Sequence, residues 1–303
     1  MQIISTNVQF SFICRVSRDE IKIIECPRDA MQGIKQFIPT EQKISYINKL
    51  LKVGYHSLDF GSFVSHDIIP QMADTAEVIG SLDLSNTKTK LIAIVANERG
   101  AEEACKFDAI DCLGFPFSVS ETFQKRNANS TIPEALERVK QIKDLTDRHS
   151  KELVLYISMG FGNPYGDAYS PEIVEQWVEK LSLLDIKTFM LSDTVGVAEP
   201  KSIQHLFSTL IPAFPKLEIG AHLHTAPHNW KVKVETAYNN GCRRFDSAIR
   251  GYGGCPMAKD ELIGNMPTEN LLNYFSHEQL GKDFNLNAFE DALREAVQIF
   301  PAH

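Results

Sequence analysis

Eight short apolar runs alternate with longer amphipathic segments along this chain, and the alternation narrows the folds open to it. The runs are rich in Ile, Leu, Val and Phe, as strands are when helices cover both faces of a parallel sheet. They comprise residues 21–26, 57–61, 90–97, 109–115, 152–160, 188–193, 217–224 and 244–249. Eight strand–helix units predict an α/β fold in which the sheet closes into a (β/α)8 TIM barrel.

The segments between the runs carry helix signals. Thr40 is placed to cap a helix whose apolar stripe includes Ile44 and Ile47. Pro133 stands in the first turn of a helix expected over residues 132–149, where a missing amide costs little. Apolar residues at helical spacing over 285–300 predict an additional helix outside the barrel. No low-complexity linker divides the chain, so residues 1–303 are expected to form a single TIM-barrel domain.

Composition and charge argue against several classes of protein. The formal net charge is −8 and Lys and Arg are not clustered, so nucleic acid and anionic membranes are not expected partners. No apolar run is long enough to cross a bilayer, and the N-terminus lacks the pattern of a secretory signal. Six cysteines are scattered without a Cys-x-x-Cys pair, which fits a reducing compartment. We therefore expect a cytoplasmic enzyme or binding protein.

Polar residues stand at the predicted carboxyl ends of the strands, where TIM barrels carry their chemistry. His222 and His224 lie two residues apart in a predicted strand, so their imidazoles point to the same side. Asp29 follows the first predicted strand, and Asn265 follows the eighth. One carboxylate, two imidazoles and an amide oxygen make a mixed site for a divalent ion such as Mg2+, Mn2+, Zn2+ or Co2+.

Several motifs occur in an order that resembles one known family. They are CPRDAMQG, SLDFGSFVSHDIIPQMAD, LSDTVGV, GAHLHT, GYGGCPMA and GNMPTEN, spread between about residues 21 and 275. Together they resemble the 3-hydroxy-3-methylglutaryl-CoA (HMG-CoA) lyase family. That family belongs to a larger group of metal-dependent lyases, aldolases and acyl-CoA condensing enzymes built on TIM barrels. The resemblance implies an acyl-CoA substrate, HMG-CoA, cleaved into acetyl-CoA and acetoacetate.

Carried over position by position, the resemblance implies roles for individual residues. The family's metal ligands fall on Asp29, His222, His224 and Asn265. Its catalytic arginine falls on Arg28, whose guanidinium suits the thioester oxygen that gathers charge as the acetyl-CoA enolate forms.

The resemblance also implies groups that handle protons or surround the substrate. The family's mobile-loop cysteine falls on Cys255, which would assist proton transfer near the enolate. A base must take the substrate's hydroxyl proton, and Asp29, His222 and Asp59 are unranked candidates. Asp193 is expected either to orient a histidine or to cap the following helix. Residues expected to support the metal or to bind substrate are Gln32, Asp193 and Thr194.

Some positions depart from the family pattern. The family usually has glutamate where Asp59 stands, so a structural role for this shorter side chain is an alternative to a catalytic one. Ala30 replaces a glycine beside the predicted metal site. The other departures are Gly33 and Ile34 in place of a polar pair, Phe60 in place of a small residue, and Met257 in place of an aromatic residue. Together they suggest a divergent lyase, or a related enzyme acting on another 3-hydroxyacyl-CoA.

Two other functions stay open. A Claisen-type synthase joining acetyl-CoA to a 2-oxo acid would use the same metal residues, although the chain ends soon after the barrel and the GGCP loop is a lyase feature. A catalytically silent metal-binding barrel would account for the departures near Asp29. Basic residues expected near the acyl-CoA are Lys35, Arg250 and Lys259. A homodimer is an expectation from the fold alone.

Overall fold

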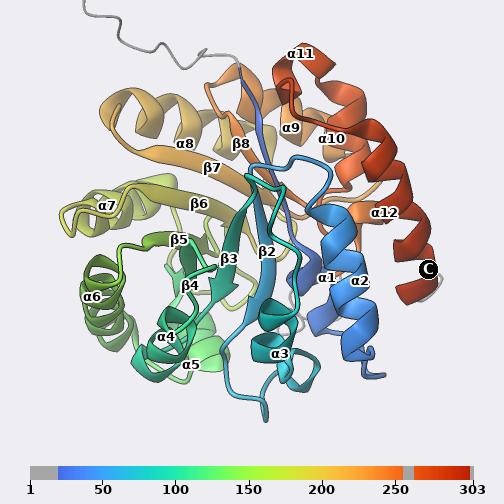
Figure 1. Ribbon diagram of the computed structural model, residues 1–303. Coiled ribbons are helices and arrows are strands. Elements are labelled where there is room, and N and C mark those ends of the chain that lie inside the picture. The colour runs from blue at the N-terminus through green and yellow to red at the C-terminus, as the bar shows by residue number, and fades with distance from the viewer. Residues whose placement is uncertain (1–19, 255–262, 301–303) are drawn as a thin grey trace, which may run out of the picture.

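Eight parallel strands form a closed barrel in a computed structural model that describes residues 20–254 and 263–300 (Figure 1). Each strand pairs with the next in sequence, and the last pairs with the first. The strands are β1 (Lys22–Glu25), β2 (Ser57–Ser62), β3 (Lys90–Ile94), β4 (Cys112–Ser118), β5 (Glu152–Ser158), β6 (Thr188–Asp193), β7 (Glu218–Leu223) and β8 (Arg244–Ser247). The predicted TIM barrel is confirmed.

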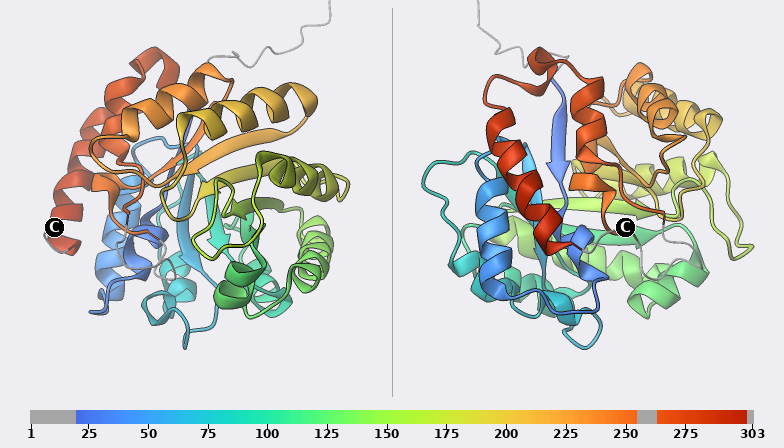
Figure 2. Two further views of the ribbon diagram at one scale, coloured as in Figure 1. Left: turned by 180° about the vertical axis from the view of Figure 1, so that it is seen from behind. Right: turned by 90° about the vertical axis from the view of Figure 1, so that its right-hand side faces the viewer.

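Helices surround the barrel on its outside (Figures 1 and 2). Within the described ranges they are α1 (Pro27–Gln32), α2 (Thr40–Leu50), α3 (Thr75–Gly80), α4 (Glu98–Cys105), α5 (Glu121–Ala128), α6 (Ile132–Arg148), α7 (Pro171–Ser182), α8 (Pro200–Ala213), α9 (Trp230–Asn239), α10 (Thr268–Tyr274), α11 (His277–Leu280) and α12 (Leu286–Ile299), with 3-10 turns η1 (Pro70–Met72) and η2 (Ile249–Gly251). The predicted C-terminal helix is α12, which packs against α2 (Figure 2).

Strand alternation divides the apolar side chains into two groups. Ile23 and Leu58 belong to the large apolar layer between the strands and the helices. Ile24 and Val154 belong to a smaller group that fills the barrel interior. Because successive side chains on a strand face opposite sides, β1 contributes Ile23 to one group and Ile24 to the other. This explains why the strands read as continuous apolar runs.

One departure from the family pattern falls outside the site. We expected Phe60 to alter the surroundings of the metal, but it lies in the apolar layer between strands and helices and is 2% exposed. The alternation that turns Asp59 inward turns Phe60 outward. The bulk of Phe60 therefore belongs to the core.

Short helices were the elements that the sequence pattern left out. Helix α1 begins at Pro27, directly after β1, and spans only six residues. Helix α5 has a single large buried apolar residue, Phe123, so it shows no apolar stripe; the hydroxyl of Ser120 caps it by accepting the Phe123 amide. In the ranges that the structure describes, no helix is long and apolar enough to cross a membrane.

Candidate metal centre at the carboxyl end of the barrel

Helix α1 brings three predicted site residues onto one turn. The Arg28 Nη1 atom donates to Asp29 Oδ1 at 3.0 Å and to Gln32 Oε1 at 2.9 Å. Gln32 Nε2 donates to Asp29 Oδ1 at 2.5 Å. Gln32 lies four positions after Arg28 and three after Asp29, so its side chain reaches both on the surface of the helix. The side chain of Asp29 is thereby held by two neighbours.

Asp59 holds the other side of the Arg28 guanidinium. Its Oδ1 accepts from Arg28 Nε at 3.1 Å, and its Oδ2 accepts from Nη2. Burial raises the pKa of Asp59 to about 6, although Arg28 acts to lower it. The pKa of Arg28 is raised above its ordinary value, since Asp59 and Asp29 outweigh its own burial. This two-point pairing fixes the plane of the guanidinium.

The four residues predicted as metal ligands come together in space. Asp29, His222 and His224 each offer a ligand atom, and these atoms lie within 4.8 Å of one another. Asn265 donates from Nδ2 to Asp29 Oδ2 at 2.7 Å, and its backbone forms a bridge with that of His224. The Nε2 atom of His224 is buried and has no hydrogen-bond partner among the described residues. A buried imidazole nitrogen without a partner fits a bound cation.

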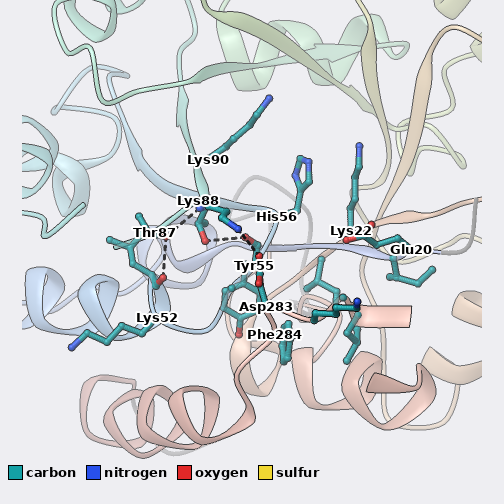
Figure 3. A pocket seen from close by; sticks show the side chains of 18 of the residues that line it. Glu20, Lys22, Lys52, Tyr55, His56, Thr87, Lys88, Lys90, Asp283 and Phe284 are labelled. Carbon is teal, nitrogen blue, oxygen red and sulfur yellow. Dashed lines mark hydrogen bonds and ion pairs between the residues drawn. The ribbon is translucent and has the colours of Figure 1, made fainter. Parts of the chain in front are cut away.

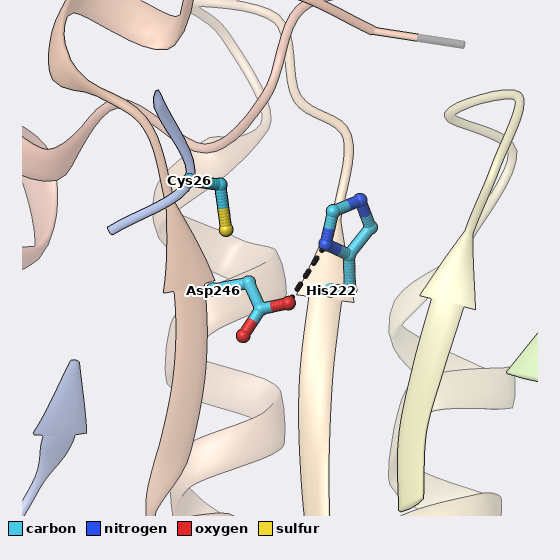
Figure 4. A group of neighbouring side chains, drawn as sticks. All are labelled: Cys26, His222 and Asp246. Carbon is cyan, nitrogen blue, oxygen red and sulfur yellow. Dashed lines mark hydrogen bonds and ion pairs between the residues drawn. The ribbon is translucent and has the colours of Figure 1, made fainter. Parts of the chain in front are cut away.

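The residues around His222 include one that the sequence analysis missed. Asp246 on β8 is 3% exposed, and its Oδ2 lies 3.0 Å from His222 Nδ1 (Figure 4). The pKa of His222 is raised because this contact outweighs burial. Cys26 lies beside the pair, and burial raises the pKa of its thiol well above the ordinary value. The signal for Asp246 in the sequence was a carboxylate on β8, the strand that pairs with the strand of His222. Asp246 would orient the ring of His222 so that its Nε2 atom faces a metal.

His224 is held through its backbone and by Thr194. The His224 ring donates a hydrogen bond to the backbone carbonyl of Thr194. Burial and the neighbouring His222 lower the pKa of His224. A neutral imidazole is the form that binds a metal. The Thr194 hydroxyl accepts the Met159 amide at 2.8 Å, which ties the end of β6 to that of β5.

Asp193 is connected to His224 through the side chain of Lys233. Its Oδ2 accepts from Lys233 Nζ at 2.6 Å, and its Oδ1 accepts the Ala198 amide at 2.9 Å just before α8. Lys233 is 2% exposed and also donates to the His224 carbonyl at 2.8 Å. The hydrogen bonds that connect Asp193 to His224 pass through Lys233 and reach the backbone carbonyl of His224. No sequence pattern indicated that Lys233 is buried, because it lies on an amphipathic helix.

A cavity of about 480 Å3 opens above these residues. Its polar floor includes Arg28, Asp29, His222 and His224. Tyr156 also lines it, and the buried hydroxyl of this tyrosine has no partner in the part of the chain that the structure describes. The volume lies in the range of sites for small organic ligands.

The other sequence predictions divide between the cavity, the core and the residues that are not described. Gly33, Ile34 and Lys35 line the cavity, but Arg250 does not. Ala30 is 4% exposed and packs in the apolar layer. Cys255, Met257 and Lys259 lie outside the described residues.

A second cleft, of about 950 Å3, lies at the opposite end of the barrel (Figure 3). Its walls come from the residues that precede β1, β2 and β3 and from the link between α11 and α12. Lys22, His56, Lys88 and Lys90 stand around it (Figure 3). The cleft is larger than the cavity above the histidines, but it contains none of the predicted site residues.

Comparison with known proteins places the chain in a family. Residues 20–295 match the HMGL-like family model. The chain is 31% identical to the Rattus norvegicus protein named 3-hydroxy-3-methylglutaryl-CoA lyase, cytoplasmic, over 90% of this chain and 79% of that protein. It superimposes on the HMG-CoA lyase structure from Pseudomonas aeruginosa with a TM-score of 0.86 at 26% identity, covering 94% of each chain.

A further solved structure carries ligands. It is the HMG-CoA lyase from Acinetobacter baumannii in complex with coenzyme A and 3-methylmalate. This structure matches with a TM-score of 0.85 at 27% identity, covering 96% of this chain and 93% of that one. The family match, the identity and the shared barrel agree with one another. This chain belongs to the HMGL-like family.

Proposed function

We propose that this protein is a divalent-metal-dependent carbon–carbon lyase that cleaves HMG-CoA, or a closely related 3-hydroxyacyl-CoA, into acetyl-CoA and acetoacetate or the corresponding oxo acid. One observation carries the proposal. Asp29, His222, His224 and Asn265 converge beside Arg28 at the carboxyl end of the barrel, and the Nε2 atom of His224 has no protein partner among the described residues.

The proposed metal ligands are Asp29, His222, His224 and Asn265, and the proposed ion is Mg2+ or Mn2+, with Zn2+ or Co2+ as alternatives. Carboxylate and amide oxygens favour the first two ions, and imidazole nitrogens are compatible with all four. When bound, the ion would act as a Lewis acid that lowers the pKa of the substrate's tertiary hydroxyl. Asp246 would support the site by holding His222 through Nδ1.

Arg28 is the proposed stabiliser of the thioester oxygen. Its contacts with Asp59, Asp29 and Gln32 use one hydrogen of Nε, one of Nη2 and two of Nη1. Among the described residues, one N–H on Nη2 is left for the substrate. Because the other contacts already hold the guanidinium, little reorganisation is needed when negative charge develops on the oxygen.

The proton-transfer candidates differ in how far their atoms are already engaged. Both oxygens of Asp59 pair with Arg28, so we assign Asp59 to orienting that arginine. The Nδ1 atom of His222 is engaged by Asp246. Asp29 stays a candidate base. Tyr156 lines the cavity, and its buried hydroxyl, which has no partner among the described residues, is a further candidate donor. Cys255, which lies outside the described residues, stays a predicted participant.

A direct assay tests the proposal against its alternatives. The purified full-length chain is incubated with Mg2+ or Mn2+ and HMG-CoA, and acetoacetate and acetyl-CoA are measured. We expect both products in equal amounts and their loss when EDTA removes the metal. A parallel reaction with acetyl-CoA and a 2-oxo acid, followed through free CoA thiol, tests the synthase. Metal binding without turnover in either reaction would instead support a silent barrel.

Three further expectations remain proposals. The name of the R. norvegicus relative supports a cytoplasmic location. A homodimer, and one domain over residues 1–303, stay predictions. Sedimentation of the purified chain and limited proteolysis would test them.

A further inference from the structure

Gln71, in the PQMAD motif, makes a set of contacts that the proposed chemistry does not use. Its amide Nε2 donates to the carbonyl oxygens of Ile34 and Gln36, each at 2.9 Å. Its Oε1 accepts the Ile38 amide, also at 2.9 Å. One side chain, 3% exposed, thus satisfies three backbone groups within five consecutive residues. Such buried contacts are costly to leave unmade.

A buried lysine reinforces this arrangement from the other side. Lys43 on α2 donates to the Gln71 carbonyl oxygen and pairs with Asp74 Oδ1 at 2.7 Å. Its ammonium also lies 4.0 Å from the centre of the Phe37 ring. Lys43 is 2% exposed, so these partners replace the water that the charge has lost. The segment is therefore held at both its backbone and its aromatic side chain.

The segment that Gln71 holds forms one wall of the cavity above the metal centre. Residues 33–38 follow α1, the helix that carries Arg28 and Asp29, without a break. Ile34 and Phe37 line the cavity, and Phe37 is 46% exposed. These two side chains give the wall an apolar surface.

We propose that Gln71 is a positioning residue for substrate: it fixes residues 33–38 so that Ile34 and Phe37 pack against an apolar part of the acyl-CoA. This inference rests on the proposed lyase function. Two parts of the ligand have suitable chemistry, the branched acyl group and the pantetheine arm. A wall that is already ordered costs less conformational entropy when substrate binds.

Two variants of Gln71 test the inference through the split between KM and kcat. Gln71→Glu removes both donors and turns a carboxylate toward two carbonyl oxygens, while Gln71→Met removes all three hydrogen bonds at similar size. For HMG-CoA we expect KM to rise about tenfold or more, with kcat within about twofold of wild type, because a displaced wall weakens substrate placement. The Mg2+ dissociation constant should stay unchanged. Gln42→Glu, the same change on the exposed face of α2, is the matched control.

The HMG thioester of N-acetylcysteamine, which lacks most of the pantetheine, identifies the part of the ligand that is bound. A KM defect with both thioesters assigns the wall to the acyl group, and a defect with HMG-CoA alone assigns it to pantetheine. A wild-type KM with both overturns the inference, even if thermal stability falls, because a purely structural role changes stability and active fraction alone.

Two further measurements keep the outcomes separate. If wild-type protein shows no turnover, the proposed function fails. Calorimetric binding of HMG-CoA to wild type and to Gln71→Met then still tests whether the segment that Gln71 holds contributes to substrate binding. If the variants do not fold, hydrogen exchange of the Ile38 amide in wild type decides the matter. We expect slow exchange from this amide, because it donates to Gln71 Oε1. Exchange as fast as in a free peptide would overturn the inference that Gln71 fixes residues 33–38.

Discussion

The two ends of the barrel both gather charged side chains, but within the described residues only the carboxyl end brings a carboxylate and two imidazoles close enough together to hold a metal ion. At the amino end, Glu218 accepts from Lys22 through Oε1 and from Arg244 through Oε2 at 3.0 Å. At the carboxyl end, His224 Nε2 is buried without a partner among the described residues, next to the Asp29 carboxylate. The amino end also has the larger cleft. Cleft size and charge therefore identify the site less well than a cluster of potential ligand atoms that includes an unpaired imidazole nitrogen.

The largest effect is expected from removing the unpaired nitrogen. His224→Ala should lose divalent-metal binding and turnover together, because only three of the four proposed ligands, Asp29, His222 and Asn265, would remain. Calorimetry with Mn2+ and an acetoacetate assay would measure the two losses. His205→Ala, at an exposed position on α8, is the control and should behave as wild type. Normal Mn2+ affinity in His224→Ala would remove the basis for the metal centre.

Arg28→Gln should separate chemistry from metal binding. We expect turnover to fall by about 10²- to 10³-fold or more, as when a donor to a developing oxyanion is lost. Metal affinity should be nearly intact, because Arg28 is not a proposed ligand. Arg148→Gln, on the outer face of α6, controls for the change of charge. Ordinary turnover in Arg28→Gln would exclude the proposed role at the thioester oxygen.

Asp246→Asn should weaken the centre without abolishing it. The substitution keeps the size of the side chain but removes the charge that holds His222 through Nδ1. We expect metal affinity to fall about 10- to 100-fold, as for other residues that orient a metal-bound histidine. Metal titration against Asp291→Asn, an exposed control on α12, measures the effect. An unchanged affinity would mean that the ring of His222 is oriented by other contacts.

The smallest effect is expected at the amino end. Lys22→Met leaves Glu218 paired with Arg244 and should cost about 1 kcal/mol or less at neutral pH, as partly exposed ion pairs do. Burial raises the pKa of Glu218, but Arg244 and Lys22 outweigh it, so the net pKa is lowered.

A lowered carboxyl pKa means that the stabilisation is present above the pKa of the unfolded chain and is lost as pH falls through the folded value. Thermal melts should therefore show the difference between Lys22→Met and wild type at pH 7 and its decline in acid. Turnover should be unaffected, with Lys52→Met as the exposed control. A large loss of activity in Lys22→Met would contradict the inference that the chemistry takes place at the carboxyl end and not at the amino end.

Residues near the chemistry were predictable where spacing alone decides direction. His222 and His224 share a side because strand residues two apart always do, and Arg28 and Asp29 are neighbours in the chain. Asp246 and Lys233 were missed because each acts across elements, on His222 from β8 and on the His224 carbonyl from α9. No local pattern reports a contact between segments that are distant in sequence.

The sequence by itself indicated the barrel, because eight apolar runs alternating with amphipathic segments favour a closed parallel sheet covered by helices. It also identified the side chains that meet at the carboxyl end. Only the tertiary structure decided how those side chains are held: Asp59 against Arg28, Asp246 behind His222, and Gln71 behind the cavity wall. Hydrophobic periodicity is a property of each segment alone. The distances between polar atoms are set by how the strands, the short helix α1 and the loops pack together.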